Sequence, residues 1–211
     1  MTLFALPLAF LLAQAAPSID PELARRYFEW TGAARLSEFQ WFSGLGVKAA
    51  KEAVASLGLT AVETGSDLMM TPAAREEYGA FRMPKAPRYC LVSSLDGLLL
   101  LRRDVQGLLS EADLQRQAPA ERGWAAVGGL KDLPSHAIVD RGRLVGLWEY
   151  DPANESIAWT SFVPVDGAMR TAVSAMESAI QEQLGDARSF SLDSPKSRAP
   201  RIEGLRAMER G

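Results

Sequence analysis

The residue types that most often carry enzyme chemistry are sparse in this chain. It has one cysteine and one histidine in 211 residues, and these are Cys90 and His136, far apart in the sequence. A structural zinc site needs four nearby ligands, and a Cys–His nucleophile pair needs its two side chains within hydrogen-bonding reach. The sequence therefore predicts no metal site and no cofactor. Cys90 lies in the apolar run 89–92 and is expected to be a small buried residue of a strand.

The densest polar cluster beside apolar sequence combines Asp96 with the adjacent pair Arg102 and Arg103. An Asp–Arg ion pair that closes the start of a sheet or barrel is the interpretation we favour. The alternative is a catalytic role for Asp96, because carboxylates whose pKa is perturbed by neighbouring charges are typical of active sites. Asp96 is the polar group that we consider as a catalytic candidate.

Basic residues at two further places have the chemistry to contact the phosphates of a nucleic acid. Arg141 and Arg143 lie at the tip of a predicted hairpin, and Lys48 and Lys51 share the outward face of a predicted helix. Affinity for a phosphate backbone comes mostly from clustered Lys and Arg. The alternative for arginines at a turn is simple exposure to solvent. The candidate DNA contacts are Lys48, Lys51, Arg102, Arg103, Arg141 and Arg143.

The two lysines are expected to be positioned by a helix-turn-helix. Ser37 and Gln40 have the spacing of a capping box, so a first helix is expected to begin at Glu38. The glycines in residues 43–46 predict a sharp turn, and the second helix is expected to end at Gly58. The expected buried stripe of the second helix is Val47, Ala50, Val54 and Leu57.

Two short apolar runs, 59–63 and 68–70, follow with a turn between them and predict a two-stranded wing. A helix-turn-helix of this kind presents its second helix to the DNA major groove. The same unit also serves as a scaffold or a protein-contact module, and the sequence leaves both interpretations open. Trp30 and Trp41 are expected to be core residues, with stacking on a base as the alternative.

The charge balance limits how DNA could be bound. The formal net charge is -3, and residues 17–83 hold seven basic side chains against nine acidic ones. A DNA-binding surface must therefore be local, or shared with other parts of the molecule. With 47% hydrophobic and 23% charged residues, the chain is expected to form one domain or two small ones.

The second half of the chain predicts a small antiparallel sheet or a partly closed barrel. Strands are expected at 88–95, in the hairpin 136–150 and at 156–163, and Asp166 is expected to start a helix. The fold class is therefore α+β: a winged helix-turn-helix followed by a small antiparallel β-sheet or barrel with a carboxy-terminal helix. The expected division is an apolar amino-terminal segment at 1–18, a winged-helix domain at 19–83, a barrel-like domain with its terminal helix at 84–187, and a basic flexible tail at 188–211.

The amino-terminal segment 3–16 is apolar and ends in Ala13-Gln14-Ala15, which has the pattern of a signal-peptidase site. It has no Lys or Arg before the apolar run, Pro7 interrupts it, and it is too short to span a bilayer as a helix. We expect no stable membrane association and a cytoplasmic location, with export as the alternative.

Four groups of residues resemble a known family. They are residues 27–32 (YFEWTG), 38–45 (EFQWFSGL), 91–96 (LVSSLD) with 101–103 (LRR), and 139–148 (VDRGRLVGLW). In this order they resemble the carboxy-terminal half of the winged-helix DNA-binding proteins that include the AlkZ-like, crosslink-repair DNA glycosylases. The resemblance covers most of the chain.

This resemblance implies tandem winged helices and a β-barrel around a DNA channel, with double-stranded DNA, alkylated or crosslinked, as the partner. In active members it implies removal of alkylated or crosslinked bases, with a catalytic Gln-x-Gln motif in an amino-terminal winged helix. The triplet at Gln14 lacks the second glutamine, so we expect a DNA-binding relative without the catalytic module. The alternatives are an active DNA glycosylase and a protein-interaction scaffold.

Overall fold

The structure is a computed structural model that describes residues 19–100, 103–120, 123–188 and 193–209. The chain divides into two compact units at the bond between Glu76 and Glu77, whereas the sequence had placed this division after residue 83. The amino-terminal segment 1–18 lies outside the described residues. A cytoplasmic location and the alternative of export therefore both stay predictions. Among the described residues, no helix is both long and apolar enough to cross a membrane.

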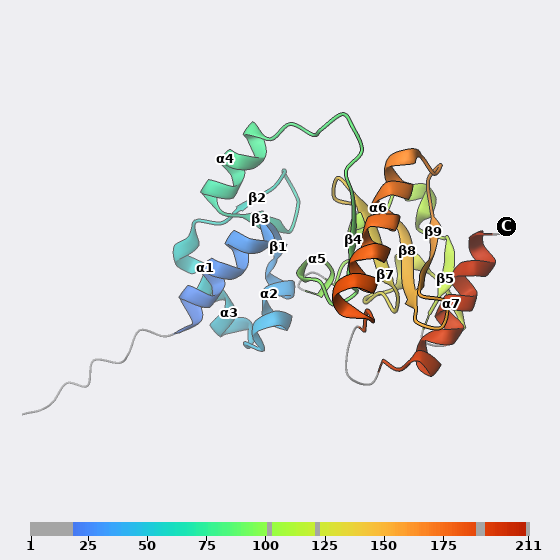
Figure 1. Cartoon of the computed structure of the whole chain (residues 1–211). Coiled ribbons are helices and arrows are strands. Elements are labelled where there is room, and N and C mark those ends of the chain that lie inside the picture. Colours follow the sequence, from blue (N-terminus) through green and yellow to red (C-terminus); the bar gives the residue numbers. More distant parts are fainter. Residues whose placement is uncertain (1–18, 101–102, 121–122, 189–192, 210–211) are drawn as a thin grey trace, which may run out of the picture. The chain divides into compact units, whose positions relative to one another are not determined.

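The first unit combines helices with a small antiparallel sheet (Figure 1). Its strands β1 and β2 both pair with β3, which gives the sheet order β1-β3-β2. A single 3-10 turn, Ala55–Leu57, extends α3 up to Gly58, where the helix was expected to end. The elements are α1 (Ile19–Thr31), β1 (Ala33–Arg35), α2 (Leu36–Ser43), α3 (Val47–Val54), β2 (Thr60–Ala61), β3 (Leu68–Met70) and α4 (Pro72–Ala80), the last of which crosses the division.

An aromatic cluster forms the core of the first unit. Tyr27 and Phe28 of α1 contact Phe39 of α2, with ring centroids 5.3 and 6.1 Å away respectively. Ala50 and Ala53 are the buried residues of α3, and their small side chains let this helix approach α1 closely. The expected stripe on α3 was therefore only partly right.

Two further expectations for this unit were wrong. Trp30 and Trp41 are 69% and 54% exposed rather than core residues, because the rings of α1 and Phe39 already fill the interior. The helix α2 begins before Glu38, and Arg35 takes the capping position: its backbone N–H donates to the Glu38 carboxylate over 2.6 Å. The sharp turn is confirmed, with Gly44 in the left-handed region at φ 70°.

The second unit is built on an open four-stranded antiparallel sheet with the order β4-β7-β8-β9. The predicted hairpin is confirmed as β7 and β8, and the strand after it as β9. The strands are β4 (Tyr89–Val92), β5 (Gln117–Pro119), β6 (Trp124–Ala126), β7 (His136–Asp140), β8 (Arg143–Asp151) and β9 (Ser156–Ser161), of which β5 and β6 pair with each other. The helices are α5 (Gly97–Leu100), α6 (Gly167–Ala179), which continues into a π-helical turn (Ile180–Leu184), and α7 (Pro195–Glu209), with 3-10 turns at Gln106–Leu108, Glu111–Asp113 and Val127–Gly129.

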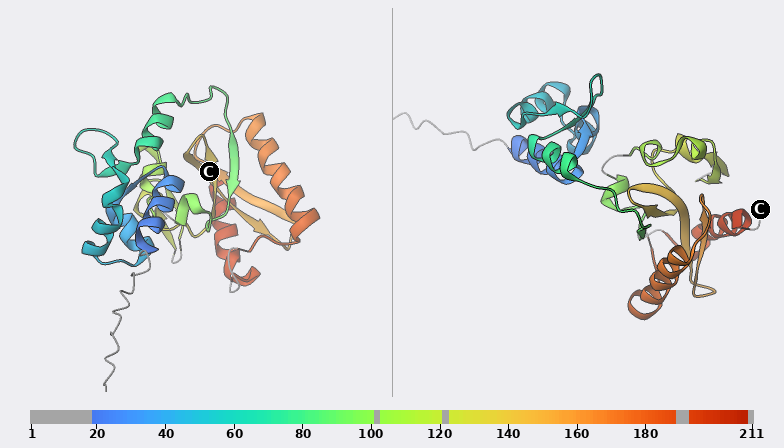
Figure 2. Two further views of the ribbon diagram at one scale, coloured as in Figure 1. Left: turned by 90° about the vertical axis from the view of Figure 1, so that its left-hand side faces the viewer. Right: turned by 90° about the horizontal axis from the view of Figure 1, so that it is seen from above.

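The helices α6 and α7 cover opposite faces of this sheet (Figure 2). Met169 and Val173 of α6 pack against one face together with Tyr150 of β8, while Ile202 and Leu205 of α7 pack against the other. Asp166 caps α6 as expected, because its carboxylate accepts the Met169 N–H over 2.8 Å. Because β4 is an edge strand, Cys90 is exposed, which corrects the expectation that it is buried.

The expectation of a basic flexible tail was wrong for residues 195–209, which form α7. Arg198 is fully buried and its guanidinium lies 2.8 Å from the Asp186 carboxylate. Arg201 pairs with Glu149 at 2.6 Å and with Asp193 at 2.8 Å. The sequence presents these arginines as a solvated basic extension, but in the fold they neutralise carboxylates that the sheet and the preceding loop bury.

We expect the replacement Arg198→Ala to lower the free energy of unfolding by about 3–5 kcal/mol, because it removes a fully buried guanidinium that pairs with Asp186 and lies near the buried Asp193. Arg188 is the matched control, since it pairs with the same Asp186 but is 56% exposed. Arg188→Ala should cost less than about 1 kcal/mol. Urea denaturation of both variants tests this, and equal losses would contradict the assignment of Arg198 as the buried anchor of α7.

Candidate nucleic-acid interface

Lys48 and Lys51 lie on the face of α3 that points away from its buried residues. The Lys48 side chain is 92% exposed, and its ammonium is 3.9 Å from the Glu52 carboxylate, which is a weak surface pair. Lys51 is exposed and has no ion-pair partner among the residues that the structure describes. Both ammonium groups are therefore accessible to an external anion.

Two acidic side chains of the first unit, Glu22 and Glu29, pair with arginines of α1. Arg25 of α1 binds both Glu22 and Glu29, at 2.7 and 2.6 Å, and Arg26 also binds Glu22. Hydrogen bonds from Arg25 and then Arg26 lower the pKa of the Glu22 carboxyl to about 2. On α3 itself one carboxylate, that of Glu52, lies beside the two lysines.

The hairpin arginines differ in availability. Arg141 has a φ of 50° at the turn, and its guanidinium binds the Asp140 carboxylate at 2.8 Å and the carbonyl oxygens of Pro84 and Lys85 at 3.2 and 3.1 Å. Arg143 is exposed and has no ion pair among the described residues. Of the two predicted DNA contacts at this turn, Arg143 is accessible to a phosphate. Arg141 instead binds the carbonyl oxygens of residues 84 and 85.

The predicted cluster around Asp96 has a structural role for the parts that can be placed. The exposed Asp96 carboxylate accepts the Leu98 N–H over 2.8 Å and so caps the first turn of α5. Arg103 binds Asp132 through two hydrogen bonds of 2.9 and 2.5 Å. Arg102 lies outside the described residues. Neither Asp96 nor Arg103 lines a cavity that the structure presents.

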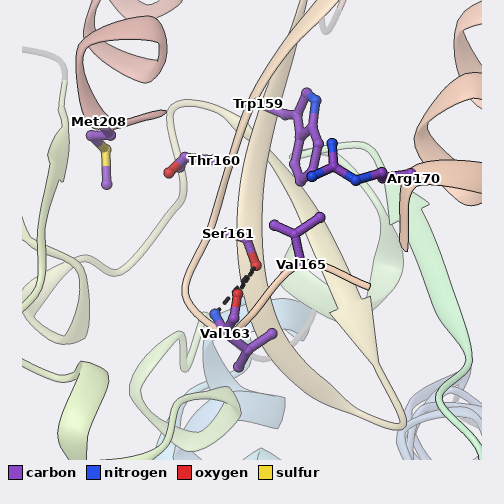
Figure 3. A pocket seen from close by; sticks show the side chains of 7 residues that line it. All are labelled: Trp159, Thr160, Ser161, Val163, Val165, Arg170 and Met208. Carbon is purple, nitrogen blue, oxygen red and sulfur yellow. Dashed lines mark hydrogen bonds between the residues drawn. The ribbon is translucent and has the colours of Figure 1, made fainter. Parts of the chain in front are cut away.

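One pocket of about 330 Å³ lies at the edge strand β9 (Figure 3). Its lining side chains come from β9, from the segment between β9 and α6, from α6 and from α7. The Ser161 hydroxyl donates to the Val163 carbonyl oxygen over 2.7 Å, so its proton is already used. The lining residues are Trp159, Thr160, Ser161, Val163, Val165, Arg170 and Met208, none of which the sequence had indicated as a site residue.

His136 and Glu149 are buried polar residues of the four-stranded sheet. His136 is 2% exposed, its Nδ1 accepts the Ser94 N–H over 3.0 Å, and burial lowers its pKa to about 4. Burial also raises the pKa of Glu149, against the opposing effect of Arg201. These groups are closed off from ligands, so they support the fold. No group of residues that could hold a metal ion occurs in the described parts of the chain.

The Gln-x-Gln spacing, which the triplet at Gln14 lacks, does occur at Gln115 and Gln117 and again at Gln181 and Gln183. All four side chains are exposed. The Gln117 amide donates to the Gln115 carbonyl oxygen over 3.4 Å, and that of Gln181 donates to the Glu155 carbonyl oxygen. Neither triplet lines the pocket, so the geometry gives these glutamines no role in a site.

The fold and the exposed basic groups define an α+β protein with a helical unit and an open antiparallel sheet, without a recognisable catalytic centre in the described residues. Comparison with protein families is specific: the model of the AlkZ-like DNA glycosylases matches residues 4–187. The chain therefore belongs to this family. The helix α7 lies beyond the matched residues.

The structure is also similar to that of the DNA glycosylase AlkZ from Streptomyces sahachiroi, with a TM-score of 0.51 and 19% sequence identity. The match covers 77% of this chain and 43% of the Streptomyces protein. The chain thus spans less than half the length of that relative, and the similarity concerns the fold. No curated protein matches the chain.

The buried His136 should make the protein less stable in acid. Because its pKa falls from 6.5 in the unfolded chain to about 4 in the fold, its contribution is present above pH 6.5 and is lost as the pH falls toward 4. The variant His136→Asn keeps an acceptor for Ser94 and cannot titrate. Between pH 6.5 and pH 4, the unfolding free energy of this variant should therefore fall by less than that of the wild type. The difference should reach up to about 3 kcal/mol.

Urea denaturation at several pH values between 4 and 7 measures this difference. Glu149, with its raised pKa, has the opposite sign, because its contribution is lost as the pH rises above 4.5. Comparing the variant with the wild type at each pH separates the two groups, and parallel pH profiles would contradict the assignment.

Proposed function

We propose that this chain binds double-stranded DNA through a winged helix-turn-helix, with α3 as the recognition helix. The order of elements in the first unit supports this: three helices, a tight glycine turn between α2 and α3, and a hairpin of β2 and β3 that follows α3. A helix-turn-helix places its second helix in the major groove. The observation that carries the proposal is the accessible pair of lysines on this helix in a chain that belongs to a DNA glycosylase family.

Lys48 and Lys51 are the phosphate contacts that we propose, and Arg143 is a third candidate from the second unit. An exposed ammonium that neutralises a phosphate releases a condensed counterion, so binding through these groups depends on salt. Arg103 and Arg141 are less suited to this role, because each guanidinium is held by a carboxylate of its own unit.

A second candidate function is removal of an alkylated or crosslinked base, which membership of the family favours. A glycosylase must hold a polar group against the reacting sugar and stabilise the positive charge that develops there. Asp96, the catalytic candidate from the sequence, caps α5 instead, so DNA binding is the better supported of the two. Release of free base from an alkylated duplex by the purified chain would establish the second candidate.

The double replacement of Lys48 and Lys51 by Ala should weaken binding to duplex DNA of any sequence. We expect the slope of log K against log salt to become less steep by about 1 to 2, because up to two phosphate contacts are lost. Fluorescence anisotropy with labelled duplex at several salt concentrations measures both quantities.

The matched control is the double replacement of Arg25 and Arg26 by Ala. It removes the same two positive charges from the same unit, but from α1, where both arginines pair with Glu22. This control should retain most of the salt dependence of the wild type. If both double variants reduce the slope equally, binding follows net charge rather than the face of α3.

A further inference from the structure

The strand β9 is an edge of the four-stranded sheet, and its backbone directions can be assigned residue by residue. Phe162, which follows β9, donates its N–H to the Val145 carbonyl oxygen of β8 over 2.8 Å. Backbone groups alternate in direction along an antiparallel strand, so the even-numbered residues of β9 face β8 and the odd-numbered residues face away. The N–H and C=O groups of Trp159 and Ser161 therefore point outward from the sheet.

Side chains close both ends of this edge and leave its middle open. At one end the outward N–H of Ile157 donates to the Glu177 carboxylate of α6 over 2.7 Å. At the other end the Ser161 hydroxyl donates to the Val163 carbonyl oxygen and accepts the Val163 N–H. Within the described part of the chain, no hydrogen bond involves the outward backbone groups of Trp159 and Ser161. These groups can pair with roughly three residues of an added strand.

The pocket of about 330 Å³ lies beside this open stretch, with lining residues from α6 and α7 as well as from β9. Figure 3 shows Arg170 of α6 reaching toward Trp159 of β9, with Val165 next to them. Trp159, Val165 and Met208 give the pocket apolar surface. Alternate side chains of an added strand point to the same side, so one of them can enter this pocket.

The charge in the pocket is positive. Arg170 is exposed and has no ion pair among the residues that the structure describes, and none of the lining residues is acidic. The carboxylate of Asp166, which precedes α6, already accepts hydrogen bonds from the Met169 N–H and the Tyr89 hydroxyl. A guanidinium matches the geometry of a carboxylate, which can accept two hydrogen bonds from it. The pocket is therefore complementary to a carboxylate.

An extended peptide fits the open edge better than a nucleic acid does. A peptide in extended form presents alternating N–H and C=O groups, so it can accept from the outward N–H groups of β9 and donate to the outward carbonyl oxygens. A phosphodiester backbone offers acceptors without donors, and it would leave the carbonyl oxygens of Trp159 and Ser161 unpaired. The edge and the arginine together favour a peptide that carries a carboxylate.

We propose that β9 and its pocket form a docking site for an extended peptide segment of a protein partner. The segment adds to the sheet as a fifth strand beside β9 and places a carboxylate on Arg170. This carboxylate belongs to an acidic side chain or to the carboxy-terminal end of the partner. The site goes beyond the proposed DNA binding, because none of its residues is a proposed DNA contact.

The test screens the full chain against an array of random octapeptides in three sets. The first set has an internal glutamate and an amidated end, the second has a free terminal carboxylate and no acidic side chain, and the third has neither. We expect the tightest binders in the first or the second set, which identifies the source of the carboxylate. The third set should bind about tenfold more weakly, because the charge-assisted hydrogen bonds are lost. Equal binding of all three sets would overturn the role of the carboxylate.

Variants of the chain test Arg170 with a labelled peptide from this screen, by fluorescence anisotropy. Arg170→Ala should weaken binding about tenfold, and Arg170→Lys should retain part of the affinity, because an ammonium still attracts a carboxylate. The matched control is Lys196→Ala, which removes an exposed positive charge of the same unit from outside the pocket and should leave the affinity unchanged. Equal losses in Arg170→Ala and Lys196→Ala would mean that binding follows net charge, and would overturn the proposal.

Backbone pairing is tested by N-methylation of the same peptide at alternate residues. Methyl groups on the N–H groups that face β9 should abolish binding, and those on the other residues should be tolerated. Hydrogen exchange measured by NMR should slow at the amides of Trp159 and Ser161 when the peptide binds, and stay unchanged at Ile157, which Glu177 already binds. Equal effects of the two methylation patterns, or protection at other amides only, would overturn the addition of a strand.

The remaining outcomes assign the edge to another occupant or to none. Protection of the Trp159 and Ser161 amides by duplex DNA, with displacement of the peptide, would assign it to nucleic acid. The same protection without peptide, together with a dimer in analytical ultracentrifugation, would assign it to a second copy of the chain. Either result, or the failure of every peptide to bind, would overturn the proposal. The salt dependence of DNA binding through α3 is measured separately, so the failure of one proposal is distinguishable from that of the other.

Discussion

Ion pairs between arginines of α7 and buried carboxylates of β8 are the interaction on which the packing of α7 against the sheet depends. The β8 strand places Glu149 and Asp151 on the face that α7 covers, and both are nearly inaccessible. Removing a carboxylate from water is costly unless a cation and hydrogen bonds replace the hydration. Arg201 and Arg206 provide these at 2.6 Å each. The apolar residues Ile202 and Leu205 of the same helix then close one side of the core.

The interior of the first unit is stabilised by side chains of a different kind. Its interior is filled by aromatic rings from α1 and α2 and by alanines from α3, so α3 packs closely and needs no charged residue to hold it. The lysines of α3 are exposed and take no part in this core. This contrast explains why basic residues of similar appearance in the sequence have different roles: Arg198 and Arg201 stabilise the protein, while Lys48 and Lys51 are available to a partner.

Membership of the AlkZ-like DNA glycosylase family and the availability of these lysines lead to the same expectation, which is contact with DNA. The likeness to the Streptomyces enzyme covers less than half of that protein, and so it concerns the scaffold more than the reaction. The polar groups that sequence reasoning associates with catalysis have structural roles here. Asp96 caps a helix, and the exposed Gln-x-Gln triplets bond to nearby carbonyl oxygens.

The sequence by itself determined the elements whose signals are local. The hairpin around Gly142, the turn at Gly44, the cap at Asp166 and the mixed α+β content follow from backbone preferences and from side-chain bonds to neighbouring residues. Only the tertiary structure decided which side chains are buried and which charges are paired. Trp41 is exposed because Phe39 already fills the core, and Arg198 is buried because Asp186, twelve residues earlier, and the sheet beneath α7 surround it. Burial and ion pairing depend on what the rest of the chain brings to a position, and no local pattern contains that information.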